Sequence, residues 1–180
     1  MKEDLNDLMQ ADPAITYAIQ LIPDAVSKDK IAPLHRAVSA TINGNQRVDT
    51  NFHISICLFR GKEGTLKRWI SLLEGLSQET QILRLMFNKV ALFSNQSLML
   101  LPDEENFARL QSIFQSIIQQ KVSPVFSKSR YPHITLAKEL NPSTFADISD
   151  KLPFSPISVL LASILITNKN QTVQISFPLK

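Results

Sequence analysis

Two short stretches decide the fold: FHISI at residues 52–56 and PHITL at residues 132–136. Each is a histidine followed two positions later by a hydroxyl residue, set among apolar residues, and His53 and His133 lie 80 residues apart. The surroundings match as well, because each stretch falls in a predicted strand that follows a strand and then a helix. This repeated context predicts a chain built from two related β-α-β halves.

The rest of the chain continues this pattern. Hydrophobic periodicity and turn residues predict strands over 15–22, 52–59, 82–93, 97–101, 131–138, 157–167 and 172–179. They predict helices over 27–42 (with Pro33 either disturbing the first half or marking the true first turn), over 65–76, from 102 onward, and within 141–152 (with Ser143 as the cap). Residues 45–51 and 123–130 are expected as loops. Mixed helices and strands with several hairpins indicate the α+β class with a largely antiparallel sheet.

The domain organisation follows from length and charge. Residues 1–13 carry a local charge of −3 up to Asp12 and end at Pro13, so we expect an acidic, flexible lead-in there. Residues 14–180 are expected to form a single domain, because this length is ample for one hydrophobic core.

The spacing inside each motif has a geometric meaning. Side chains alternate between the two faces of a strand, so residues i and i+2 share a face. His53 and Ser55 therefore point the same way, as do His133 and Thr135. If the two halves pack around a pseudo-two-fold axis, both pairs face one groove.

Such a groove has a defined chemistry. Imidazole is the side chain best suited to proton transfer near neutral pH, and two imidazoles supply a base and an acid in one turnover. Hydroxyl groups donate hydrogen bonds to phosphoryl oxygens. One His-x-Ser in a strand means little, but the pair in matching contexts indicates metal-free phosphodiester chemistry.

The paired motifs resemble those of the two-histidine (2H) phosphoesterase superfamily, which includes 2′-5′ RNA ligase-like proteins and 2′,3′-cyclic phosphodiesterases. The resemblance runs from about Ile15 to Leu179 through the order of elements, and PHITL is its closest match. FHISI has Phe52 where the family often has Pro, and Ile56 where Leu is common. Neither change touches the histidine or the hydroxyl.

The resemblance implies a bilobal fold around a central groove. It implies His53 and His133 as the catalytic acid/base pair, in an order the sequence leaves open, and Ser55 and Thr135 as phosphate-binding residues. The implied activity opens 2′,3′-cyclic phosphates at RNA ends or on nucleotides, or acts on 2′-5′ RNA linkages, with no cofactor and no metal. Two alternatives stay open. One is a phosphodiesterase for a small nucleotide such as an ADP-ribose cyclic phosphate or a 2′-5′ oligonucleotide. The other is a non-catalytic RNA- or nucleotide-binding module.

Residues beside the second motif are further candidates for substrate binding. Tyr131 shares strand parity with His133 and could stack a base. Arg130 and Lys138 could contact flanking phosphates, although strict alternation turns Lys138 away from His133. Arg60 and Lys62 follow the first strand and could act in the same way.

The two remaining residues of reactive type are expected to be structural. Strict alternation puts Cys57 on the face of His53, but about 13 Å away, too far for a shared metal or a nucleophilic pair. Cys57 is therefore expected to be buried and inert. His35 falls in a predicted helix without a partner motif.

Composition narrows the function further. The chain has 180 residues, 19 basic and 16 acidic side chains, and one cysteine, which excludes a disulfide scaffold. No apolar run approaches the 20 or so residues that span a bilayer, and no Gly-rich phosphate loop is present. Residues 106–138 carry five basic and no acidic side chains, which indicates an anionic ligand. We expect a cytoplasmic monomer that binds an RNA end or a small nucleotide with a cyclic phosphate, and neither membrane nor DNA.

Overall fold

The computed structural model describes residues 14–42, 47–48, 51–93, 96–151, 154–168 and 174–180. The lead-in expected over 1–13 lies outside the described residues, as does most of the loop expected over 45–51.

Helices and strands alternate along the chain, as the sequence predicts. The helices are α1 (Ala25–Thr41), α2 (Glu63–Glu79), α3 (Glu104–Gln119) and α4 (Pro142–Lys151). The strands are β1 (Ile15–Pro23), β2 (Arg47–Val48), β3 (Ile54–Gly61), β4 (Leu83–Leu92), β5 (Leu98–Pro102), β6 (Val125–Lys128), β7 (Ile134–Lys138), β8 (Ile157–Asn168) and β9 (Gln174–Pro178). The predicted α+β class with an antiparallel sheet is confirmed.

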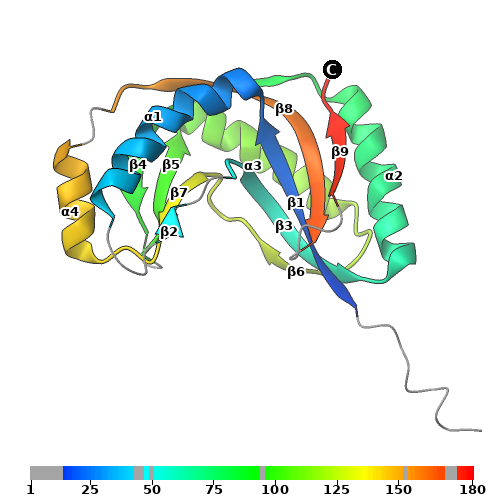
Figure 1. Cartoon of the computed structure of the whole chain (residues 1–180). Helices are drawn as coiled ribbons and strands as arrows, with labels where there is room; N and C mark the ends of the chain where they lie inside the picture. The colour runs from blue at the N-terminus through cyan, green and yellow to red at the C-terminus, as the bar shows by residue number, and fades with distance from the viewer. Residues whose placement is uncertain (1–13, 43–46, 49–50, 94–95, 152–153, 169–173) are drawn as a thin grey trace, which may run out of the picture.

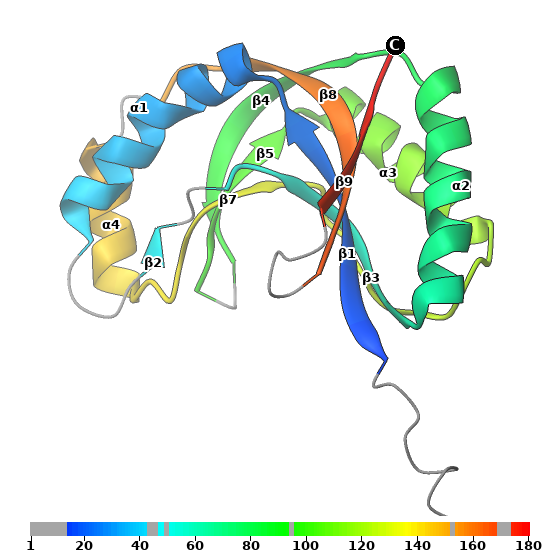
Figure 2. The same cartoon turned by 45° about the vertical axis from the view of Figure 1, so that its right-hand side comes forward.

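The arrangement of strands in the sheet reflects the two related halves of the chain. Its strand order is β2-β7-β5-β4-β8-β1-β3-β6, with β9 paired to β8. A further pairing of β3 with β7 closes the path from β7 through β5, β4, β8 and β1 to β3 into a ring. One half of the ring holds β8, β1 and β3, and the other holds β4, β5 and β7. In Figures 1 and 2, α1 and α4 lie together at one end of the arch and α2 lies at the other.

Two short strands join the halves. β2 precedes β3 in the chain but pairs with β7, and β6 precedes β7 but pairs with β3. The loops expected over 45–51 and 123–130 therefore contain strands, which corrects the prediction. Strands of two and four residues are too short for a hydrophobic alternation, and their partners lie in the other half of the chain.

Side-chain caps set where two helices begin. The Asp24 carboxylate accepts a hydrogen bond from the Ser27 backbone N–H (2.7 Å), so α1 starts two residues earlier than predicted. Pro33 consequently lies inside α1 rather than in its first turn. At α4, the Asn141 side chain accepts from the backbone N–H three residues on (2.7 Å), so Asn141 and not Ser143 is the cap.

The core lies between the sheet and the helices. Trp69 of α2 is fully buried, packs against Phe59 of β3 (5.1 Å between ring centroids) and donates from Nε1 to Ser123 Oγ (2.9 Å). Phe59 in turn stacks on Tyr17 of β1 at 5.1 Å. These rings tie α2 to the strand that carries the first motif. No helix within the described residues is long and apolar enough to cross a membrane.

Candidate active site

The first motif lies at the start of β3 and is followed by a β-bulge. Ser55 lies opposite Gln20 of β1, whereas Cys57 lies opposite Ile19, so two steps along β3 match one step along β1. The extra residue reverses the alternation beyond it. Cys57 is therefore in the core, 2% exposed, and not on the face of His53 as strict alternation predicted. Burial raises the pKa of its thiol to about 12, which leaves it protonated and inert.

The second motif carries the same irregularity. On β7, Thr135 lies opposite Met99 of β5, and Ala137 lies opposite the residue just before Met99. The alternation again reverses after the hydroxyl residue, which returns Lys138 to the face of Thr135. The prediction that Lys138 faces away from His133 is therefore wrong, because a bulge leaves no trace in the periodicity of a five-residue strand.

Pairing of β3 with β7 brings the two motifs together. Ile54 and Ile134, the central residues of the motifs, lie opposite each other in an antiparallel pair, and both are fully buried. This register sets each histidine opposite the hydroxyl residue of the other motif, on the sheet face away from the two isoleucines. The histidines are then diagonal neighbours, about 7–8 Å apart and somewhat less between their Cβ atoms. The four residues that share this face are His53, Ser55, His133 and Thr135.

Both imidazoles are held in the same way. His53 donates from Nδ1 to the carbonyl of Asn51 (2.6 Å), and His133 donates from Nδ1 to the carbonyl of Tyr131 (2.5 Å). A carbonyl oxygen only accepts, so each Nδ1 carries the proton. With Nδ1 engaged in this way, Nε2 is the ring nitrogen that can exchange a proton, as acid–base chemistry requires.

The environment of His133 sets its charge. Burial lowers the pKa of His133 below its ordinary value of 6.5, and the nearby charges of His53 and Lys138 lower it further. The hydrogen bond to the Tyr131 carbonyl acts in the opposite direction. The net effect keeps this imidazole neutral at neutral pH, so its Nε2 is ready to accept a proton.

A cavity of about 530 Å³ opens beside the first motif. Among the residues that line it are His53, Gln20, Arg60, Lys138, Thr167 and Asn168. The Arg60 guanidinium lies 5.0 Å from the centre of the Phe126 ring, a cation–π contact that holds this charge at the rim. Lys138 and Arg60 thus place two cations around the cavity that contains His53.

Gln20 is a site residue that we did not predict. It is 7% exposed, it lies opposite Ser55, and its Oε1 is buried without a hydrogen-bond partner among the described residues. A buried amide oxygen without a partner is costly, and such groups often mark a place where a ligand or water completes the bonding. The signal was present in the sequence, because Gln20 is the polar exception in the apolar part of the strand predicted over 15–22.

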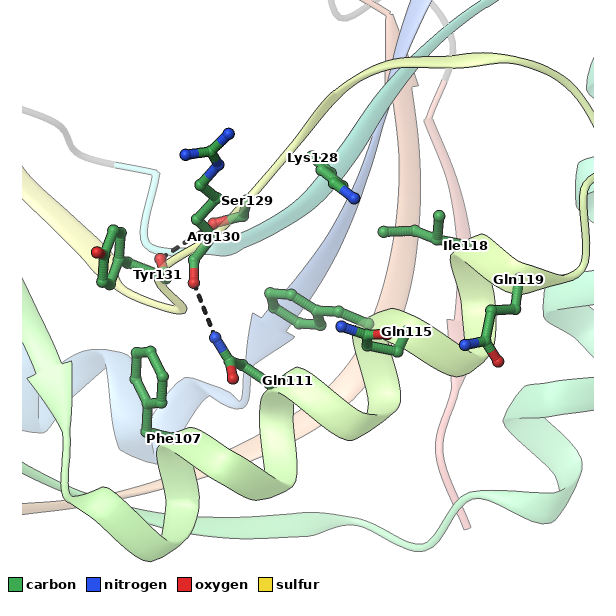
Figure 3. Close-up of a pocket in the computed structure, with 10 residues that line it drawn as sticks. Phe107, Gln111, Gln115, Ile118, Gln119, Lys128, Ser129, Arg130 and Tyr131 are labelled. Carbon is green, nitrogen blue, oxygen red and sulfur yellow. Dashed lines mark hydrogen bonds between the residues drawn. The ribbon is translucent and has the colours of Figure 1, made fainter.

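The described lining of this cavity includes the predicted residues His53, Arg60 and Lys138, but not Ser55, His133 or Thr135. The other predicted residues lie apart from it. Tyr131 and Arg130 line a second cavity, between α3 and residues 128–131 (Figure 3). The Arg130 carbonyl accepts a hydrogen bond from Gln111 Nε2 (3.0 Å), and its guanidinium points away from α3. His35 packs edge-on against Phe52 (5.5 Å between centroids) and lines neither cavity.

This architecture, with its paired motifs on strands that meet at the centre, is the fold of the 2H phosphoesterases, as the sequence resemblance predicted. No protein-family model and no curated protein sequence matches the chain, so the likeness is one of structure.

Three solved structures illustrate it. The first is TT0787 of Thermus thermophilus, with 14% identity, coverage of 92% of this chain and 98% of that one, and a TM-score of 0.63. The second is Escherichia coli LigT complexed with 3′-AMP, with 13% identity, coverage of 94% and 96%, and a TM-score of 0.59. The third is Kluyveromyces marxianus Usb1 with uridine monophosphate, with 15% identity, coverage of 92% and 98%, and a TM-score of 0.52. LigT and Usb1 are 2H phosphoesterases.

Proposed function

We propose that this protein is a metal-independent phosphoesterase that opens 2′,3′-cyclic phosphates at RNA ends or on nucleotides. The observation that carries the proposal is the arrangement of two imidazoles, each fixed through Nδ1 to the carbonyl two residues before it, beside two hydroxyls on one sheet face. The nucleotide ligands of the similar structures, 3′-AMP in LigT and uridine monophosphate in Usb1, support the same substrate class.

The two histidines divide the proton transfers. His133, held neutral by burial, removes a proton from water through Nε2 as the water oxygen forms a bond to phosphorus. On the opposite side, the bond from phosphorus to the ribose 3′ oxygen breaks, and the protonated Nε2 of His53 gives that oxygen its proton. The products are a ribose 3′-hydroxyl and a 2′-phosphate. Reversal of the reaction exchanges the two roles.

The hydroxyls act on the charge that develops during this step. Ser55 and Thr135 each lie directly across from one of the histidines, so their hydroxyl groups reach the non-bridging oxygens of a phosphoryl group held between the rings. Hydrogen bonds there strengthen as negative charge accumulates in the transition state. Lys138 and Arg60 add positive charge around the cavity that His53 lines.

Proton transfer by two imidazoles needs no metal. Within the part of the chain that the structure describes, no group of three or more His, Cys, Asp or Glu side chains is placed to hold a metal ion. We therefore expect turnover to persist in EDTA.

The direct test is hydrolysis in EDTA of cytidine 2′,3′-cyclic phosphate and of a short RNA ending in a 2′,3′-cyclic phosphate. Phosphorus NMR distinguishes a 2′-phosphate product from a 3′-phosphate. The expected result is a 2′-phosphate from at least one of the two substrates. Binding of both without turnover by the folded chain would point instead to a nucleotide-binding module.

Replacement of Gln20 by leucine should separate activity from stability. The amide oxygen offers an acceptor for the attacking water, so its loss is expected to lower kcat/KM by about tenfold, the value of one hydrogen bond to a reacting group. Stability should stay constant or rise, because the variant removes a buried oxygen that has no partner among the described residues.

Met99 provides the matched control for this variant, since it occupies the corresponding place opposite Thr135. Met99→Leu is expected to keep both activity and melting temperature. Full activity of the Gln20→Leu protein would show that Gln20 has no role in turnover.

The pH profile should report the charge around His133. Because His133 acts as a base only when neutral, the acid limb of kcat/KM for the wild type should have its midpoint below pH 6.5. The Lys138 charge helps to lower this pKa, so Lys138→Met is expected to raise it and to move the acid limb to higher pH. Lys89→Met, which removes an exposed lysine outside both cavities, should leave the limb in place. An acid limb that moves to lower pH in Lys138→Met would contradict the assignment.

A further inference from the structure

The second cavity, between α3 and residues 128–131, has a volume of about 590 Å³. Its walls combine aromatic, amide and basic side chains, as Figure 3 shows. The main lining residues are Phe107, Gln111, Gln115, Ile118 and Gln119 from α3, and Lys128, Arg130 and Tyr131 from the opposite wall. This volume lies within the range of pockets that bind small molecules, about 300–1,000 Å³.

A row of rings connects the catalytic face to this cavity. Phe93 stacks on His133 with ring centroids 6.3 Å apart and an angle of 27° between the planes. Tyr131 meets Phe93 at 5.6 Å and Phe107 at 6.1 Å. The row therefore begins at a catalytic imidazole and ends in the cavity wall. Tyr131, in the middle of the row, is 54% exposed and can be covered by a ligand.

The wall formed by residues 129–131 is fixed on both sides. Ser129 Oγ donates to the Tyr131 carbonyl (3.0 Å), and Gln111 Nε2 of α3 donates to the Arg130 carbonyl (3.0 Å). The Tyr131 carbonyl is also the acceptor that orients His133. One short segment therefore positions the imidazole and shapes the cavity, so the distance between the two sites is set by the backbone.

The chemistry of the cavity suits single-stranded nucleic acid. Proteins bind such strands by stacking bases on aromatic rings and by placing cations along the phosphate backbone. Tyr131 and Phe107 provide the rings, and Lys128 provides a cation. Residues 106–138, which include both walls, carry no acidic side chain that would repel a phosphate. The amides of Gln115 and Gln119 offer donors and acceptors to the edge of a base.

We propose that this cavity binds the nucleotide that precedes the terminal cyclic-phosphate nucleotide, which makes short single-stranded RNA the preferred substrate over a free cyclic nucleotide. The inference rests on the proposed function, because it assumes that the cyclic phosphate lies between His53 and His133. The terminal nucleoside then lies along Phe93 and Tyr131, and the chain continues toward α3.

The test compares kcat/KM for cytidine 2′,3′-cyclic phosphate with kcat/KM for a tetranucleotide that ends in the same group. Stacking of one base on an aromatic ring is worth roughly a tenfold gain or more, so the tetranucleotide should be favoured by at least about tenfold. Gln115→Trp fills the cavity from the exposed surface of α3 and should reduce this ratio toward one. Ser116→Trp places the same side chain on an exposed position outside the cavity and should keep the ratio.

Binding provides a second readout that does not need turnover. A fluorescent tetranucleotide ending in a 2′-phosphate should bind wild type and Ser116→Trp about tenfold more tightly than Gln115→Trp, the same factor as for stacking one base. Turnover of both substrates at equal kcat/KM would overturn the subsite and leave the proposed function standing. If neither substrate is turned over, but the tetranucleotide binds wild type more tightly than Gln115→Trp, the proposed function is overturned and the subsite stands. Binding that Gln115→Trp leaves unchanged would overturn the subsite in either case.

Discussion

Alanine at His53 or at His133 is expected to lower kcat for a 2′,3′-cyclic phosphate by about 10²–10⁴-fold, the usual contribution of a positioned acid or base. Each variant removes one of the two proton transfers, and neither ring has a substitute on the same sheet face. Because the two act in one step, the double variant should be little worse than the poorer single variant. Steady-state kinetics in EDTA measures the loss, and circular dichroism shows that the variants are folded.

The third histidine of the chain is the control for this experiment. His35 packs against Phe52 and lines neither cavity, so His35→Gln should retain kcat within a few-fold of the wild type. A His53→Ala or His133→Ala protein with the kcat of the wild type would contradict the two-histidine mechanism. Equal losses in all three variants would point to a structural effect.

Removal of either motif hydroxyl, at Ser55 or at Thr135, is expected to cause the second large loss of kcat. Removal of one preorganised donor to a developing oxyanion typically costs about 10²–10³ in kcat, so Ser55→Ala and Thr135→Val should each fall in or near this range. The loss should appear in kcat more than in KM, since these hydrogen bonds strengthen in the transition state. Both residues are partly buried, and the replacements preserve their approximate shape, so melting temperatures should change little.

Ser39→Ala, at an exposed position of α1, is the matched control for the hydroxyl variants and should be fully active. If Thr135→Val raised KM and left kcat intact, Thr135 would hold the substrate without stabilising the transition state. Ser55 and Thr135 can be compared directly, because the pseudo-symmetry places them in equivalent positions.

Much of the architecture could be predicted because it depends on residues that are close to one another in the sequence. Apolar periodicity located most of the strands and helices, and the repeated His-x-hydroxyl motif indicated the duplication. The alternation of side chains along a strand predicts that each histidine shares a face with the hydroxyl residue of its own motif. These features depend on neighbours within a few positions, where the sequence pattern is a direct consequence of backbone geometry.

The features that escaped prediction depend on contacts between distant segments. The bulges after Ser55 and Thr135 are defined only by the register against β1 and β5. They reverse the faces of Cys57 and Lys138, so that strict alternation misplaced both. The pairing of β2 and β6 with the opposite halves is likewise invisible in stretches of two and four residues. Gln20 gained its meaning only when the register placed it across from Ser55.

The exchange of β2 and β6 between the halves bears on what a shorter chain could do. Each half completes its sheet edge with a strand from the other, and each contributes one imidazole, so neither half alone holds both histidines. A polypeptide with a single copy of the unit would reach that state only as a homodimer about a true two-fold axis, by mutual strand swapping. In the single chain the two halves are covalently linked, so their association is intramolecular and independent of protein concentration. Co-expression of two fragments of the chain, divided between β4 and β5 so that each carries one motif, should therefore restore activity that either fragment alone lacks.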